Sequence, residues 1–413
     1  KVVDRYTLKV EWKRRTRVSR WATMEVYPLP GWLYSRTEQG EKIPEEKVAE
    51  RFNRHWTTRE GVGLGTGPYV VGESNRDSVE LNPNLNYWRE RPPIAGITYK
   101  VVPDMSRTAE MLRNNQLDIA KLTPGVYHDM MLKAGKSDPF ASHGLAYEKV
   151  TRPMYFYIGW NTDEPLFSDA RVRQAMTHAF DRERVLEELF HGLGTVMDGP
   201  ILPGHPANHP DVTPYSHDLD RAATLLEEAG WADTDDDGVR EKTIDGEVEE
   251  FRFSMLIYNK TNTREYARIF AEDLREIGVV MTPVPTGWAR LQKRMNARDF
   301  DAYTGGWALG WEIDPYQIWH SSQADVPKGS NKVGFRNERA DEIIEELRAT
   351  FDSDRRIELL REFHEIVHEQ QPYTFLYSTQ TVFAWRKEVQ NVGFQKFRPV
   401  DVSIPWFFET ADE

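Results

Sequence analysis

The sequence contains no cysteine in its 413 residues, which excludes disulfide bonds and thiolate chemistry. A cysteine-free chain tolerates oxidising and reducing compartments alike, so this absence assigns neither. No apolar run approaches the roughly 20 residues that a membrane-spanning helix needs. Basic residues are outnumbered: 53 Lys and Arg face 66 Asp and Glu, for a net charge of −13. The basic cluster Lys13-Arg14-Arg15 with Arg17 is short, so we expect no nucleic-acid partner.

Two common catalytic signatures are also missing. No Gly-x-Ser-x-Gly sequence occurs, so the nucleophile turn of a serine hydrolase is not indicated. The glycine-dense segment 61–67 lacks the following Lys and helix of a phosphate-binding loop. His205 and His209 stand in a proline-rich loop, where we expect both to be solvated.

Aromatic residues, by contrast, are abundant, with 13 Trp, 17 Tyr and 19 Phe. Trp and Tyr combine a large apolar body with one polar group, so they suit ligand-binding clefts and protein cores alike. Composition leaves both interpretations open. The length exceeds that of one ordinary domain and predicts two or three lobes.

Hydrophobic periodicity predicts strands that alternate with helices, which is typical of α/β lobes. Ser168 or Asp169 is expected to cap one helix, Asp218 to open another, and Gly230 to end it. The expected strands cover residues 1–10, 97–102, 154–160, 251–258, 279–282 and 373–382. The expected helices cover residues 108–114, 170–189, 219–229, 263–277, 338–348 and 354–369.

Several short sequences recur in an order that resembles a known family. They include Gly65-Thr66-Gly67-Pro68-Tyr69, Gln116-Leu117-Asp118-Ile119-Ala120, the run from Pro165 to Ala175, the segment from Gly306 to Ser322, and Pro372-Tyr373. Each is weak alone, but the ordered set resembles the family-5 bacterial extracellular solute-binding proteins, which serve ABC importers of oligopeptides, dipeptides or nickel. The resemblance covers essentially the whole chain.

The resemblance implies an α/β, two-lobe fold of the periplasmic-binding-protein type (type II), with mixed sheets flanked by helices. We expect lobe one to comprise residues 1–153 and 385–413, and lobe two residues 154–384. The hinge is expected near residues 152–155 and 383–385. Relative to the family pattern, the chain lacks about the N-terminal quarter, which leaves lobe one incomplete.

The resemblance also implies a function without catalysis or cofactor. A monomeric protein would capture an oligopeptide or dipeptide-like solute between its lobes and deliver it to a membrane permease. Nickel, haem and oligosaccharide remain alternative ligands. The expected location is the periplasm or the outer face of the cytoplasmic membrane, where a lipid anchor on the missing N-terminal part would hold it.

Candidate ligand-binding residues follow from the same resemblance. Trp288 and Trp307, 19 positions apart, would line a pocket for ligand side chains. Peptide binders of the family commonly carry an Asp three residues after the second Trp, to pair with the ligand's α-ammonium, but Gly310 stands there. Glu312 or Asp314 would have to supply that charge, and a buried carboxylate needs a cationic ligand or an Arg partner. The set is completed by Trp311 and Tyr155.

Two further motifs point elsewhere. His364-Glu365-Ile366-Val367-His368 fits the His-Glu-x-x-His pattern of zinc metallopeptidases, with Glu388 as a candidate third ligand. The apolar residues of that helix place His364 at the edge of its buried face and His368 nearer to solvent, which favours a packing helix. Asp233 to Gly238 resembles the start of a calcium-binding EF-hand loop, but the twelfth position is Ile244, so an Asx-rich turn is expected and calcium is the alternative.

Overall fold

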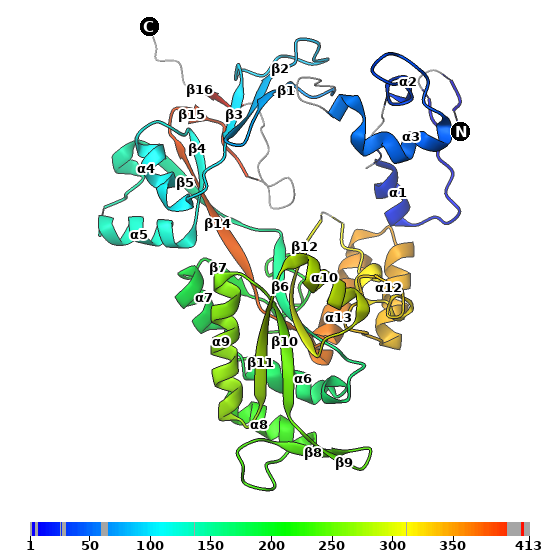
Figure 1. The fold of residues 1–413 in the computed structure, drawn as a ribbon, viewed down its shortest axis with the longest axis vertical. Coiled ribbons are helices and arrows are strands. Elements are labelled where there is room, and N and C mark those ends of the chain that lie inside the picture. Colours follow the sequence, from blue (N-terminus) through cyan, green and yellow to red (C-terminus); the bar gives the residue numbers. More distant parts are fainter. Residues whose placement is uncertain are drawn as a thin grey trace. The chain divides into compact units, whose positions relative to one another are not determined.

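The computed structural model describes residues 2–4, 7–24, 26, 30–58, 65–135, 137–310, 312–394 and 406–408. Contacts divide the chain into two compact units. Unit 1 comprises residues 2–23 and 151–380, and unit 2 comprises residues 24–150, 381–394 and 406–408. Figure 1 shows the helices and strands of both units, coloured along the chain.

Unit 1 is built on a five-stranded mixed sheet with the strand order β11-β10-β12-β6-β13. β10 runs parallel to β11 and to β12, whereas β6 pairs antiparallel with β12 and with β13. The register places Trp307 opposite Tyr155. The strands of the unit are β6 (Met154–Trp160), β7 (Gly194–Val196), β8 (Glu241–Ile244), β9 (Glu247–Glu250), β10 (Arg252–Tyr258), β11 (Val280–Thr286), β12 (Ala302–Ala308), β13 (Tyr373–Phe375) and the first part of β14 (Tyr377–Arg386).

Both faces of this sheet are buried: successive side chains point to opposite faces, and a separate hydrophobic core covers each face. On β6, Ile158 and Trp160 belong to the core of one face, and Tyr155 and Tyr157 belong to the core of the other. Helices α6 to α9 contribute to the first core, and α10 to α13 contribute to the second. In Figure 1, α9 lies along the β10–β11 edge of the sheet.

Short polar side chains start several helices of unit 1. The carboxylate of Asp169 accepts the N–H of Arg171 at 2.8 Å, and that of Asp218 accepts the N–H of Arg221 at 2.8 Å. Gly230, with φ of +88°, lies just beyond α8, as expected for a helix terminator. The helices are α1 (Arg17–Met24), α6 (Ala170–His178), α7 (Arg182–Phe190), α8 (Leu219–Glu228), α9 (Thr261–Glu276), α10 (Trp288–Ala297), α11 (Tyr316–Trp319), α12 (Glu338–Ala349) and α13 (Ser353–Gln370).

Unit 2 contains an antiparallel sheet in the order β1-β2-β3, and a second sheet in which β14 lies between β4 and β5. β14 pairs antiparallel with β4, where Val382 faces Leu122. The strands are β1 (Tyr69–Ser74), β2 (Ser78–Pro83), β3 (Ile97–Lys100), β4 (Ile119–Leu122), β5 (Leu145–Thr151), β15 (Val389–Gln390) and β16 (Phe407–Phe408). The helices are α2 (Gly31–Tyr34), α3 (Glu45–Arg51), α4 (Thr108–Arg113) and α5 (Pro124–Ala134).

The mixed α/β architecture agrees with the sequence prediction, but three local predictions are wrong. Instead of a strand over residues 1–10, the described residues there form only an isolated bridge between Val2 and Leu8. The helix expected over residues 170–189 is two helices, because Asp181 caps a new one by accepting the N–H of Arg184 at 2.9 Å. The strand expected over residues 373–382 is interrupted at Leu376. None of the helices within the described ranges has the length and apolar character that crossing a bilayer requires.

The N-terminal segment packs within unit 1, although the expected lobe one grouped it with residues 24–153. The Arg15 guanidinium lies 5.0 Å from the centre of the Phe351 ring, and Arg17 donates to the Phe351 carbonyl at 3.4 Å. A division into lobes that close on a ligand stays a prediction.

Candidate ligand-binding site

A pocket opens in unit 1 beside the segment that follows β12. Its volume is about 150 Å³, close to that of an engineered apolar cavity that binds benzene. The lining comes from the start of β6, the proline-rich loop after β7, the segment after β12, and helices α11 and α13. Residues far apart in the sequence therefore meet at one place.

The pocket wall is mainly apolar. Trp319 is 2% exposed, and its ring centre lies 4.7 Å from that of Tyr373 in the core behind it. Tyr155 is also buried, and burial raises the pKa of its hydroxyl well above the ordinary value, so this group stays neutral. The aliphatic part of the wall includes Ile201, Leu202, Leu309, Ile313 and Ile318.

Glu312 lines the pocket and is held by two arginines. Arg17 Nε donates to both carboxylate oxygens of Glu312, at 3.0 and 3.1 Å, and Arg356 Nη2 donates to Oε1. The side chains of Glu312, Arg17 and Arg356 are only 16%, 24% and 8% exposed. Burial lowers the pKa of Arg356, and the Glu312 carboxylate opposes that shift. The arginine partner that a buried carboxylate requires is therefore present.

Asp314 also has an arginine beside it. Arg348 Nε lies 3.4 Å from Asp314 Oδ2, and the Arg348 guanidinium covers the Tyr316 ring at 4.2 Å from its centre. Asp314 Oδ1 accepts the N–H of Tyr316 at 3.3 Å. Both predicted carboxylates of the pocket are thus engaged with groups of the protein itself.

The proline-rich loop after β7 contributes a wall that the sequence analysis did not predict. Pro200, Ile201, Leu202 and His205 line the pocket, and His205 is half-buried rather than solvated. His205 Nδ1 accepts the N–H of Ala207 at 3.0 Å, and burial lowers the pKa of its imidazole. The density of proline and apolar residues between 200 and 206 was the available signal.

Trp288 and Trp307 do not belong to the lining of this pocket. Trp288, at the start of α10, is 59% exposed and packs edge-on against Tyr258, with ring centres 5.7 Å apart. Trp307 is half-buried in β12, where its Nε1 donates to the Tyr373 hydroxyl at 3.3 Å. Trp311 lies outside the described residues. Of the six predicted residues, the pocket brings together Tyr155, Glu312 and Asp314.

The His-Glu-x-x-His motif packs into the core of unit 1. His364 is completely buried, deeper than expected, and its Nε2 lies 3.3 Å from Asp198 Oδ1. A Cβ atom at Gly199 would lie 2.7 Å from the His364 ring, so backbone closes this side of the imidazole. His368 Nδ1 is hydrogen-bonded to the Asp198 carbonyl at 2.7 Å. These contacts describe a packing helix, with His364 in the core and His368 bonded to the backbone of Asp198.

The candidate third zinc ligand, Glu388, has an arginine partner. Glu388 lies in unit 2, where its carboxylate is 3.5 Å from Arg386 Nε. Within the described residues, the one cluster of three potential metal ligands is Asp233, Asp235 and Asp237.

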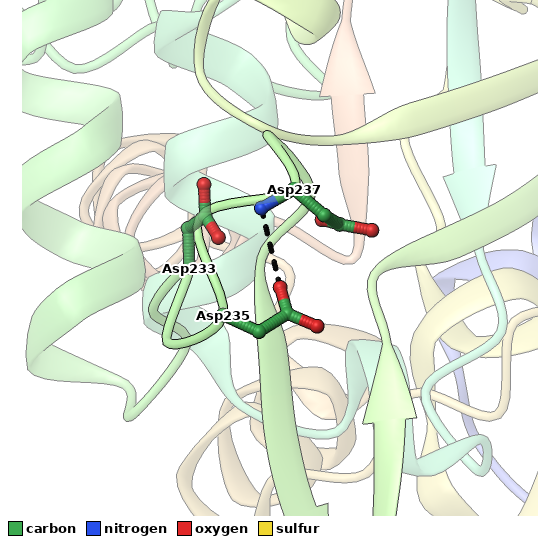
Figure 2. A group of neighbouring side chains, drawn as sticks. All are labelled: Asp233, Asp235 and Asp237. Atoms are coloured by element: carbon green, nitrogen blue, oxygen red, sulfur yellow. Dashed lines mark hydrogen bonds between the residues drawn. The ribbon is translucent and has the colours of Figure 1, made fainter.

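These three aspartates form an exposed turn between α8 and β8, drawn in Figure 2. One ligand oxygen of each lies within 4.8 Å of the others. Each carboxylate also accepts a backbone N–H: Asp233 from Gly238 at 2.9 Å, Asp235 from Asp237 at 3.2 Å, and Asp237 from Val239 at 2.8 Å. An Asx-rich turn is therefore observed.

Comparison with known proteins gives a consistent result. The family described as bacterial extracellular solute-binding proteins, family 5 Middle, matches residues 1–328. The oligopeptide-binding protein AppA of Bacillus subtilis is 31% identical over 351 residues, which are 83% of this chain and 62% of the relative. The heme-binding protein A of Haemophilus influenzae is 26% identical over 81% of this chain and 56% of the relative. The chain thus spans about three-fifths of the length of these relatives.

The fold comparison supports the same grouping. The solved structure of Bacillus subtilis AppA in complex with a nonapeptide matches with a TM-score of 0.69 and 28% identity, over 90% of this chain and 73% of that one. The periplasmic-binding-protein type of fold predicted from the sequence is thereby confirmed. Members of this family are binding proteins rather than enzymes.

Proposed function

The chain belongs to the family-5 bacterial extracellular solute-binding proteins, and from this membership we propose that it captures a peptide-type solute for an ABC importer. The observation that carries the proposal is the apolar pocket of unit 1, lined by Tyr155 and by the segment after β12. A ring-sized apolar pocket suits a peptide side chain. The similarity to an oligopeptide-binding relative supports the same ligand class.

The mechanism we propose is closure of two lobes around the ligand. A ligand that contacts both lobes only in the closed state binds that state more tightly, and so shifts the equilibrium toward closure. A membrane permease then receives the solute from the closed form. On this account the protein acts in the periplasm or at the outer face of the cytoplasmic membrane.

Trp288 and Trp307 remain proposed ligand-binding residues. Trp288 is 59% exposed, so its truncation removes little packing. We expect Trp288→Ala to weaken peptide binding about tenfold, as for an aromatic anchor of an interface. Trp32→Ala is the matched control, because Trp32 is 71% exposed in unit 2. Equal affinities of the two variants and the unmodified protein would remove Trp288 from the site.

Native mass spectrometry of the purified protein tests the ligand class. We expect peptide masses to co-purify and to dissociate on activation in the gas phase. Nickel or haem bound at one per chain would instead favour the metal-complex alternative. Stoichiometric zinc together with peptide hydrolysis would revive the peptidase hypothesis and overturn the proposal.

A further inference from the structure

The pocket of unit 1 is small and has a defined apolar wall. Its volume of about 150 Å³ matches one benzene-sized group rather than a whole ligand. Ile201, Ile313 and Ile318 provide aliphatic contacts, and Trp319 closes the buried side. An apolar group that enters this space is removed from water and gains contacts on several sides.

The charged groups around the pocket do not favour a cation. Its two carboxylates, Glu312 and Asp314, already face three guanidinium groups, those of Arg17, Arg356 and Arg348. The local sum is therefore about one positive charge. A cationic ligand group would have to displace an arginine or lie beside it, and either arrangement leaves charge poorly compensated in a partly buried place.

The other two titratable groups of the pocket, Tyr155 and His205, do not change its net positive charge. The Tyr155 hydroxyl is neutral, because burial raises its pKa, and burial lowers the pKa of His205, which keeps its imidazole neutral at pH 7. The carboxylates are thus structural parts of the wall, and they are not free anchors for a ligand ammonium group.

We propose that this pocket selects one uncharged apolar side chain of the ligand, of about the size of a benzene ring, and rejects a lysine or arginine side chain in that place. The proposal rests on the peptide-type function proposed above and specifies which side chains that site accepts. Arg17, Arg356 and Arg348 act as specificity determinants because they occupy the carboxylates.

Three small probes of equal ring size test the pocket directly: benzyl alcohol, benzylamine and phenylacetate, which are neutral, cationic and anionic at pH 7. Isoleucine methyl NMR locates the binding, with Ile201, Ile313 and Ile318 as reporters and Ile269, in the opposite core, as the control. We expect benzyl alcohol to shift the methyl signals of the three reporters and not that of Ile269. Benzylamine should bind at least about tenfold more weakly than benzyl alcohol. We expect phenylacetate to bind more tightly than benzylamine. The proposal would be overturned if the reporter methyl signals did not shift, or if benzylamine bound with the same affinity as either of the other two probes.

An arginine variant tests the cause of the selectivity. Arg17→Met leaves Glu312 with Arg356 alone, so the ratio of benzylamine to benzyl alcohol dissociation constants should fall at least about threefold. Arg268→Met makes the same charge change on the exposed face of α9, where Arg268 pairs with Glu272, and should leave the ratio unchanged. A ratio that is the same in both variants would refute the role of Arg17.

Peptides separate this proposal from the proposed function. Pentapeptides of alanine would carry one Phe or one Lys at each position in turn. Binding of Phe peptides with rejection of Lys at one position supports both proposals. Binding that does not distinguish Phe from Lys at any position retains the peptide function and overturns the pocket's selectivity. No binding of any pentapeptide, with the probes behaving as expected, overturns the peptide function alone.

Discussion

Replacing Glu312 by Gln should cost far more stability than the same change at an exposed ion pair. Removal of one partner of a buried ion pair costs roughly 3–5 kcal/mol, because the other charge is left uncompensated. Arg356 is 8% exposed, but it keeps the carbonyls of Leu347, Thr350 and Ile313 as acceptors. Gln can still accept one hydrogen bond, so we expect Glu312→Gln to lower the unfolding free energy by about 2–3 kcal/mol.

Glu346→Gln is the matched control. Arg355 donates from Nε and from Nη2 to Oε1 of Glu346, at 2.9 and 2.8 Å, but both side chains are more than 40% exposed. Water and salt screen such a pair, so no measurable loss is expected. Urea unfolding followed by tryptophan fluorescence and by far-UV circular dichroism measures both variants. Equal losses of unfolding free energy in the two variants, or a loss for Glu312→Gln that disappears in 0.5 M salt, would refute the description of Glu312 as part of a buried ion pair.

Three further predictions concern other parts of unit 1. Gly199→Ala should destabilise by about 1–3 kcal/mol, because its Cβ would meet the buried His364 ring at 2.7 Å. Gly287→Ala should not destabilise, because no atom of the described residues lies within 4 Å of the Cβ that it adds. Thermal unfolding that ranks the two variants in the opposite order would contradict this packing. A Cβ atom added at Gly310 would have room, since the Glu312 carbonyl oxygen is 4.0 Å away. In calorimetric titrations Gly310→Asp should therefore favour peptides with a free amino terminus over N-acetylated ones, because the new carboxylate can pair with the α-ammonium group. Burial lowers the pKa of three histidines, so the folded state disfavours their protonation. The free energy of unfolding should therefore fall as the pH drops below about 6.5. A thermal-unfolding midpoint at pH 5.5 equal to that at pH 7.5 would contradict this. The histidines are His178, His205 and His368.

Local signals predicted most elements of the fold. Asp169 and Asp218 cap the helices that they were expected to cap, because N-capping depends on residues three positions away at most. The expected strand over residues 154–160 has the bounds of β6. The prediction of a strand over residues 1–10 was wrong, because the alternation of apolar and polar residues does not show whether a partner strand exists. The break between α6 and α7 was missed although Asp181 is itself a good cap, because the apolar period continues across it.

The site was less predictable, because its contacts span long distances in sequence. A buried Glu312 was predicted to need either a cationic ligand or an arginine, but no local pattern identifies Arg17, which is 295 residues away. The depth of His364 was underestimated, because Gly199 and Asp198 come from another part of the chain. Spacing likewise could not tell that Trp288 would be exposed while Trp307 would donate to Tyr373.

Calorimetric titration with three ligands tests the peptide-binding function most directly. The purified protein would be titrated with an alanine pentapeptide that carries one Phe, with nickel chloride, and with haemin. We predict one peptide bound per chain, with a negative heat-capacity change from apolar burial, and no comparable binding of nickel or haemin. Stoichiometric binding of nickel or haemin, with no heat from the peptide, would contradict the account.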